Sequence, residues 1–247
     1  MKVEDALDDP DWVNAMHEDL HNFERNQVWT LVEKPDGKHS VIGTKWVFRN
    51  KQDKDGQVVR NKAHLIAQGY TQVQGMDYGE TYAPVTRLES IRIILAYANH
   101  HDITLYQMDI KSAFLNGEIE EEVYVKQPPD FVNPKKSDHV YKLYKALYDL
   151  KQAPRAWYKC LTKFLIQKCF EMGKLDSTLF TKRVNGELFV CQIYVDDIIF
   201  GSTNPHFSEK FGRLMSEKFE MSMMCELKFF LGLQIKQTTE GTFVSKT

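Results

Sequence analysis

Residues 188–201 read Leu-Phe-Val-Cys-Gln-Ile-Tyr-Val-Asp-Asp-Ile-Ile-Phe-Gly, two apolar runs with adjacent carboxylates between them. The pattern predicts a strand, a tight turn and a second strand, with Asp196 and Asp197 at the tip. Adjacent carboxylates repel each other and resist burial, so a divalent cation is their natural counter-charge. An aspartate pair in a hairpin turn is also common for conformational reasons alone, and this alternative stays open.

A third aspartate strengthens the metal hypothesis. Asp109 ends the apolar run 103–108 and precedes Ile110-Lys111-Ser112-Ala113-Phe114. Three carboxylates from two strand ends can converge on two Mg²⁺ ions, which prefer a few carboxylates plus substrate phosphates. That arrangement is typical of two-metal phosphoryl transfer, in which we expect Mn²⁺ to be an alternative ion.

Composition favours a globular intracellular protein. Of the 247 residues, 43 % are hydrophobic, enough for one substantial core or two small ones. No apolar stretch approaches the roughly 18 residues of a membrane span, and the acidic N-terminal residues do not resemble a signal segment. The four cysteines form no Cys-x-x-Cys pair, so we expect reduced thiols in an intracellular protein, with neither a zinc site nor a disulfide framework.

The net charge of −2 is unexpected for a protein that binds nucleic acid, but the charges are segregated. Between residues 140 and 168, seven lysines and arginines stand against Asp149 alone. A second basic group comprises Lys45, Arg49, Lys51, Arg60 and Lys62. Such groups are usually solvated faces, but neighbouring aromatic residues favour a groove that binds a nucleic-acid strand.

Helical and strand patterns are mixed along the chain, which indicates one α+β domain. Helices are expected over 11–26, 88–99, 154–170 and 207–218, the first capped by Asp9 and begun by Pro10. Strands are expected over 41–51, 58–70, 103–109, 123–125, 140–143, 178–183, 187–195, 227–235 and 241–244, with turns at 53–56 and at Asn185-Gly186.

Several motifs in one order resemble the reverse transcriptase domain of plant copia-type LTR retrotransposons. They read Ile-Gly-Thr-Lys-Trp-Val-Phe (42–48), Ala-Gln-Gly-Tyr-Thr-Gln (67–72), Gln-Met-Asp-Ile-Lys-Ser-Ala-Phe-Leu-Asn-Gly (107–117), Leu-Lys-Gln-Ala-Pro-Arg-Ala-Trp-Tyr (150–158), Tyr-Val-Asp-Asp (194–197) and Phe-Phe-Leu-Gly-Leu (229–233). The resemblance implies an α+β right-hand polymerase fold with an antiparallel palm sheet and an incomplete thumb. It places the fingers at about 26–102 and 116–150, the palm at about 103–115 and 151–235, and the start of a following region at 236–247.

The resemblance also implies roles for single residues. Asp109, Asp196 and Asp197 would hold two metal ions together with the backbone carbonyl of Ile110. The residues expected at the incoming nucleotide are Ile110, Ala113, Phe114, Gln152, Pro154, Lys45, Lys51 and Lys62, with Phe114 resembling a steric gate against a ribose 2′-hydroxyl. The residues expected at primer or template are Tyr194, Arg155, Trp157, Phe230, Leu231 and Gly232. Ordinary packing or surface exposure remains the alternative for all of these except the aspartates.

The chain departs from the family pattern at His64, Asp149 and Cys225, where arginine, glycine and glycine are usual. A neutral imidazole cannot make arginine's bidentate phosphate contact, and Asp149 puts a β-carbon where glycine tolerates unusual backbone angles. We therefore predict reduced or absent activity despite intact metal ligands.

The resemblance implies RNA-directed DNA polymerisation during retrotransposon replication, in a cytoplasmic particle or the nucleus. The expected partners are a primer on an RNA or DNA template, deoxynucleoside triphosphates and other segments of a Pol polyprotein (RNase H and integrase), with no membrane. Two alternatives stay open. One is a catalytically impaired remnant that at most binds nucleic acid, and the other is a different metal-dependent phosphoryl transferase such as a cyclase.

Overall fold

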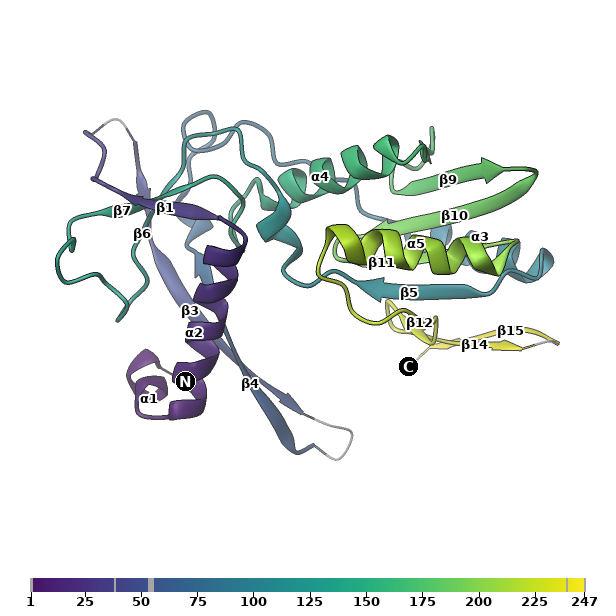
Figure 1. The fold of residues 1–247 in the computed structure, drawn as a ribbon, viewed down its shortest axis with the longest axis horizontal. Helices are drawn as coiled ribbons and strands as arrows, with labels where there is room; N and C mark the ends of the chain where they lie inside the picture. The colour runs from purple at the N-terminus through teal and green to yellow at the C-terminus, as the bar shows by residue number, and fades with distance from the viewer. Residues whose placement is uncertain (1, 38, 53–55, 239, 247) are drawn as a thin grey trace. The chain divides into compact units, whose positions relative to one another are not determined.

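The computed structural model describes residues 2–37, 39–52, 56–238 and 240–246. Helices and strands are mixed throughout, as expected for an α+β protein, and form two compact units (Figure 1). Unit 1 comprises Met1–Tyr82 and Phe114–Cys160, and unit 2 comprises Ala83–Ala113 and Leu161–Thr247. No described helix is long and apolar enough to cross a membrane. Each unit is described by itself below.

Two helices open unit 1, α1 (Val3–Leu7) and α2 (Pro10–Arg25). The predicted start of α2 is confirmed, because the Asp9 carboxylate accepts a hydrogen bond from the Asp11 amide (2.9 Å) and Pro10 occupies the first turn. The apolar face of α2 is buried, with Trp12, Met16 and Phe23 each at most 6 % exposed. This burial, rather than intrinsic propensity, is the main stabilising contribution to the helix.

Unit 1 contains two sheets. The first has the strand order β1 (Trp29–Val32), β7 (Val140–Leu143), β6 (Tyr124–Lys126), β2 (Val41–Ile42), and the second pairs β3 (Thr44–Gln52) with β4 (Val58–Ala67). The single strand expected over 41–51 is wrong, because the chain changes sheets at Gly43. A β-carbon there would meet the end of the Gln68 side chain, so glycine leaves room for this close contact without moving Gln68.

The β3–β4 hairpin itself is confirmed, with an antiparallel register from Thr44↔Ala67 to Gln52↔Val58. Its return strand ends at Ala67 and not at Tyr70, because a 3-10 turn, η1 (Gly69–Thr71), follows. The predicted turn residues 53–55 lie outside the described residues.

Unit 2 is built on a six-stranded sheet (Figure 1). Its order is β12 (Cys225–Glu226), β5 (Leu105–Asp109), β11 (Asp197–Ser202), β10 (Glu187–Tyr194), β9 (Leu179–Val184), β8 (Glu171–Met172). The predicted Asn185-Gly186 hairpin is confirmed, since both residues have positive φ (53° and 84°) between β9 and β10. The helices of this unit are α3 (Leu88–His100) and α5 (Pro205–Lys218), while α4 (Ala153–Gln167) continues from unit 1 into it. A second 3-10 turn, η2 (Ala113–Asn116), follows β5.

The C-terminal strands correct another expectation. Residues 227–235 are not one strand, because β13 (Phe229–Phe230) turns at Leu231 and Gly232, whose φ angles are 49° and 76°. The chain returns as β14 (Leu233–Thr238), which pairs with β15 (Gly241–Lys246) as expected. Glycine supports this sharp turn because it adopts positive φ without steric cost.

Both faces of the six-stranded sheet contribute to the core of unit 2. One face contacts α3 and β13–β14, through a cluster that includes Ile91, Leu95, Val190, Ile199 and Phe230. An aromatic cluster joins α5 to the strands, with Phe211 at ring-centroid distances of 4.8 Å from both Phe189 and Phe200. Burial on both faces explains why β10 and β11 read as nearly continuous apolar runs.

Candidate active site

The Tyr194–Asp197 segment forms the predicted hairpin tip. Tyr194 on β10 pairs with Asp197 on β11, which leaves Val195 and Asp196 as a two-residue turn. Val195 has φ 54°, a left-handed conformation that is rare for a β-branched residue and costs roughly 1–3 kcal/mol. The turn therefore needs support from the strands around it to keep this conformation.

The structure brings Asp109 to the same end of the sheet. Asp109 and Asp197 are direct partners in the β5–β11 register, and the amide of Ile110 donates a hydrogen bond to the carbonyl of Asp196 (2.9 Å). Residues directly opposite on antiparallel strands point to the same face. The carboxylates of Asp109 and Asp197 are thus neighbours, with the exposed Asp196 beside them in the turn.

Electrostatics at this end of the sheet favour a cation. Burial, then repulsion from Asp196 and from Asp109, raises the pKa of Asp197 to about 6. A positive ion would relieve both the repulsion and the desolvation of the charged form. Within the described residues, however, no three carboxylate, imidazole or thiolate side chains are already arranged as a metal site. An ion at these aspartates would have to complete its shell with water or substrate oxygens, which is the coordination that Mg²⁺ commonly adopts.

Three expected nucleotide-site residues follow Asp109 on the chain. Ile110 is 1 % exposed and forms an isolated bridge with Met221, so only its backbone carbonyl is a candidate ligand. Ala113 is buried and is the last residue of the unit 2 segment Ala83–Ala113. Phe114 belongs to unit 1, where its ring packs edge-on against Tyr148 at a centroid distance of 5.1 Å.

The 150–158 segment holds a buried hydrogen-bond network within unit 1. Gln152 is 2 % exposed, donates to the Asp77 carbonyl (3.1 Å) and accepts from the Gln72 side chain (3.0 Å). These hydrogen bonds of the Gln152 side chain fix the start of α4, where Pro154 lies in the first turn. Ordinary packing at a helix start is thus a sufficient role for both residues. Arg155 is ion-paired with Glu80. Trp157 is 1 % exposed, which favours packing in the core over stacking on a base.

The basic residues of the β3–β4 hairpin share one face. The register pairs Lys45 with Ile66, Arg49 with Lys62, and Lys51 with Arg60. Because cross-strand partners and alternate residues lie on the same side, the five cations follow one face of the hairpin. Lys45 also lies over the Tyr70 ring (5.8 Å to its centroid), and Arg60 is ion-paired with Glu18.

The remaining residues expected at the primer lie in unit 2. Phe230 packs edge-on against Tyr194, and Leu231 and Gly232 form the turn that follows Phe230.

Comparisons with known proteins identify the family. The family described as "Reverse transcriptase (RNA-dependent DNA polymerase)" matches residues 26–247. The chain belongs to this reverse transcriptase family. It is 37 % identical over 241 residues to the retrovirus-related Pol polyprotein from transposon RE1 of Arabidopsis thaliana, covering 98 % of this chain and 16 % of that protein. It is 36 % identical over 224 residues to the polyprotein from transposon TNT 1-94 of Nicotiana tabacum, covering 90 % of this chain and 17 % of that protein.

These relatives confirm the resemblance to plant copia-type retrotransposon reverse transcriptases. The chain spans about a sixth of the length of these polyproteins. Within the described residues the four cysteines form no disulfide, and Cys191 is buried whereas Cys225 is exposed on β12.

Two of the family departures now have a structural context. Asp149 has φ 71°, the left-handed conformation that glycine would adopt without cost. His64 is half-buried, and its Nδ1 lies 3.1 Å from a carboxylate oxygen of Asp19 on α2. The other oxygen of Asp19 accepts the Leu65 amide (2.8 Å), so His64 helps to hold α2 against β4. Cys225, by contrast, has no positive φ and pairs as an ordinary strand residue with Gln107.

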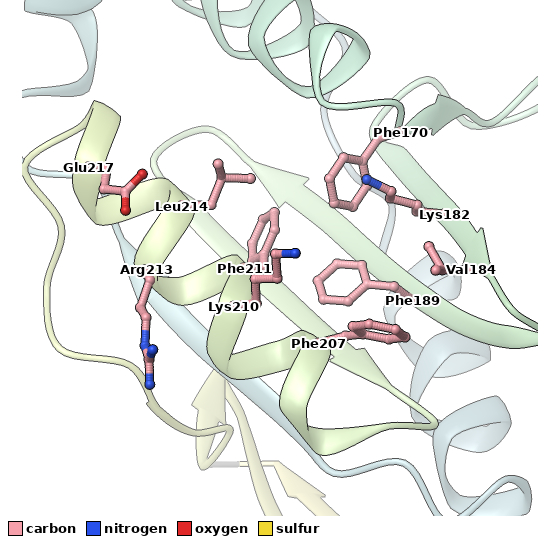
Figure 2. A pocket seen from close by; sticks show the side chains of 10 residues that line it. All are labelled: Phe170, Lys182, Val184, Phe189, Phe207, Lys210, Phe211, Arg213, Leu214 and Glu217. Atoms are coloured by element: carbon pink, nitrogen blue, oxygen red, sulfur yellow. The ribbon is translucent and has the colours of Figure 1, made fainter.

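Unit 2 also contains a cavity of about 390 Å³ (Figure 2). It is lined by α5 residues and the β9–β10 hairpin, with an aromatic floor that includes Phe170, Phe189, Phe207 and Phe211. None of the expected site residues lines it. The Lys182 ammonium at its edge donates to the Lys168 carbonyl (2.7 Å).

Proposed function

We propose that this chain is the polymerase portion of a retrotransposon Pol polyprotein and adds deoxynucleotides to a primer on an RNA or DNA template. The observation that carries the proposal is the register pairing of Asp109 with Asp197, beside Asp196, in a member of the reverse transcriptase family. In the reaction, the primer 3′-hydroxyl oxygen bonds to the α-phosphorus of the nucleotide. The bond to the β-phosphate oxygen breaks, pyrophosphate leaves and the hydroxyl proton is released.

The chain's own residues would supply position and charge. Asp109, Asp196, Asp197 and the carbonyl of Ile110 would hold two Mg²⁺ ions. When bound, these ions lower the pKa of the attacking hydroxyl and offset the charge on the phosphates. The raised pKa of Asp197 supports a cation at this site, because ionising that carboxylate is unfavourable without one.

We further propose that unit 1 acts largely as the fingers and unit 2 largely as the palm of a right-hand fold. The basic face of the β3–β4 hairpin would then contact phosphates through Lys45, Lys51 and Lys62. The ring of Phe114 would exclude a ribose 2′-hydroxyl. RNase H and integrase activities would belong to other segments of the polyprotein.

A second candidate, an impaired remnant that only binds nucleic acid, is favoured by the left-handed backbone of Asp149. RNA-templated extension of a DNA primer in Mg²⁺ separates the two. The polymerase proposal expects incorporation that stops on chelation and in Asp109→Asn. Tight binding of primer–template at low salt with no incorporation under any condition would leave the remnant as the function.

A further inference from the structure

Unit 2 contains a buried cluster of hydrogen-bonded side chains that contacts β10 just before the Val195–Asp196 turn. It comprises the side chains of Thr86, Ser90, Asp176, Thr178 and Gln192, and is called the Asp176 cluster below. Thr86, Thr178 and Gln192 are each at most 5 % exposed. The members come from the start of α3, the loop before β9, and β10, so the cluster joins three parts of the unit.

The Asp176 carboxylate is the common acceptor. It accepts hydrogen bonds from the Ser90 hydroxyl (2.6 Å), the Thr178 amide (2.9 Å) and the Thr178 hydroxyl. Burial alone would raise the pKa of Asp176, but these hydrogen bonds, with one from Gln192, together lower it. The carboxylate is therefore ionised at neutral pH, and hydrogen bonds to a charged acceptor are stronger than neutral ones.

The donors of Gln192 connect this carboxylate to the strand that leads into the turn. Its side-chain nitrogen lies 2.6 Å from the Thr178 hydroxyl and 3.0 Å from the Thr86 hydroxyl. The Thr86 hydroxyl contacts the carbonyl of Ile193, and the Ile193 amide donates to the Thr178 carbonyl (2.9 Å). Both backbone polar groups of Ile193 are thus held immediately before Tyr194.

The turn needs such support for two reasons. Val195 occupies a left-handed conformation that a β-branched residue adopts at a cost, and strained residues persist only where the surroundings enforce them. Repulsion from Asp196 and Asp109 acts on Asp197 on the other side of the turn. Neither Asp176 nor its partners carry an assigned role in the proposed polymerase site.

We infer that Asp176 and Thr178 are positioning residues, which hold β10 and thereby the Val195–Asp196 turn in the geometry that presents the aspartates. The inference deepens the proposed function, and the effect it predicts on kcat rests on that function. The effect it predicts on backbone hydrogen exchange does not depend on any activity. The inference and the proposed function can therefore fail separately.

Hydrogen exchange, measured by mass spectrometry, tests whether the cluster holds the backbone of the turn. Thr178→Val keeps the shape but removes the hydroxyl, and we expect exchange over residues 193–197 to become about tenfold faster, as local opening becomes easier. Thr178→Ser restores the hydroxyl and should restore protection. The matched control is Thr181→Val on the following strand β9, because the hydrogen bonds described for this cluster do not involve the Thr181 hydroxyl.

Kinetics test the consequence for the site. In Asp176→Asn and Thr178→Val we expect kcat to fall about tenfold or more with KM for the nucleotide nearly unchanged, because the aspartates are misplaced while the substrate contacts remain. A residue that only stabilises the fold would lower the melting temperature and leave kcat per folded molecule unaltered. Unchanged exchange over 193–197 in both variants overturns the inference. Faster exchange in a chain that never polymerises supports it and instead rejects the proposed function.

Discussion

Asp109 and Asp197 are direct register partners on the neighbouring strands β5 and β11, and their side chains share one face of the sheet. Two carboxylates placed opposite each other destabilise a protein without a ligand, and the raised pKa of Asp197 reflects this cost. Under the proposed function, a bound cation would compensate for this destabilising pair.

Replacing Asp197 by asparagine should stabilise the metal-free protein at pH 7.5. The folded-state pKa is about 6 against an ordinary value of 3.8, so ionisation costs folding energy that accumulates as the pH rises from about 4 to about 6. Solvent screening at this half-exposed site limits the gain in unfolding free energy to about 1 kcal/mol. Urea unfolding in a chelator measures it. A gain of equal size at pH 3.5, where the carboxyl is mostly protonated in both states, would contradict the explanation.

Restoring glycine at position 149 should raise polymerase activity more than stability. The relief of a left-handed aspartate is offset by the greater chain entropy of glycine in the unfolded state, so we expect the unfolding free energy to change by less than about 1 kcal/mol. Primer extension by Asp149→Gly, alone and with His64→Arg, measures the activity. The matched control is Asp102→Gly, since Asp102 is also exposed and has φ 52°. Full activity in the unaltered chain would refute the predicted impairment.

The Asp19 side chain should be far more important for stability than its neighbour Glu18. Asp19→Ala leaves the Leu65 amide and the His64 ring without their acceptor, which should cost about 2–3 kcal/mol of unfolding free energy. Glu18→Ala removes only the exposed ion pair with Arg60 and should cost less than about 1 kcal/mol. Chemical denaturation of both variants decides the matter, and equal losses would show that the buried carboxylate has no special role.

The basic face of the β3–β4 hairpin should determine the salt dependence of nucleic-acid binding. Replacing Lys45 and Lys51 by glutamine should weaken primer–template binding and reduce the slope of log affinity against log salt by about 1 per lost phosphate contact. Fluorescence anisotropy at several salt concentrations measures the slope. Lys218→Gln on α5 is the control, and an equal slope in all three proteins would exclude this face as the phosphate contact.

Most of the fold could be predicted from local patterns. The hairpin at Asn185-Gly186 and the cap at Asp9 each depend on a few adjacent residues, and both are confirmed. The sheet change at Gly43 and the turn at Leu231 were missed, because a close contact with Gln68 and a left-handed leucine leave no periodic signal.

The candidate site was predictable to a similar degree. The pairing of Asp109 with Asp197 was predictable because each residue lies at the end of an apolar strand pattern, and Asp197 belongs to the motif Tyr-Val-Asp-Asp. The Asp176 cluster was not found, because its members are polar residues spread over 86–192 and only the fold brings them together. The burial of Trp157 agrees with an inward position on the helix expected over 154–170, whereas its expected contact with primer or template is not supported by a buried ring.

The most direct test of the central claim is Mg²⁺-dependent extension of a DNA primer on an RNA template by the Asp149→Gly/His64→Arg chain, with and without Asp196→Asn. We predict incorporation of deoxynucleotides that depends on Mg²⁺ and falls to background when Asp196 is replaced. No incorporation by the restored chain, or equal incorporation with and without Asp196, would contradict the assignment of this carboxylate site.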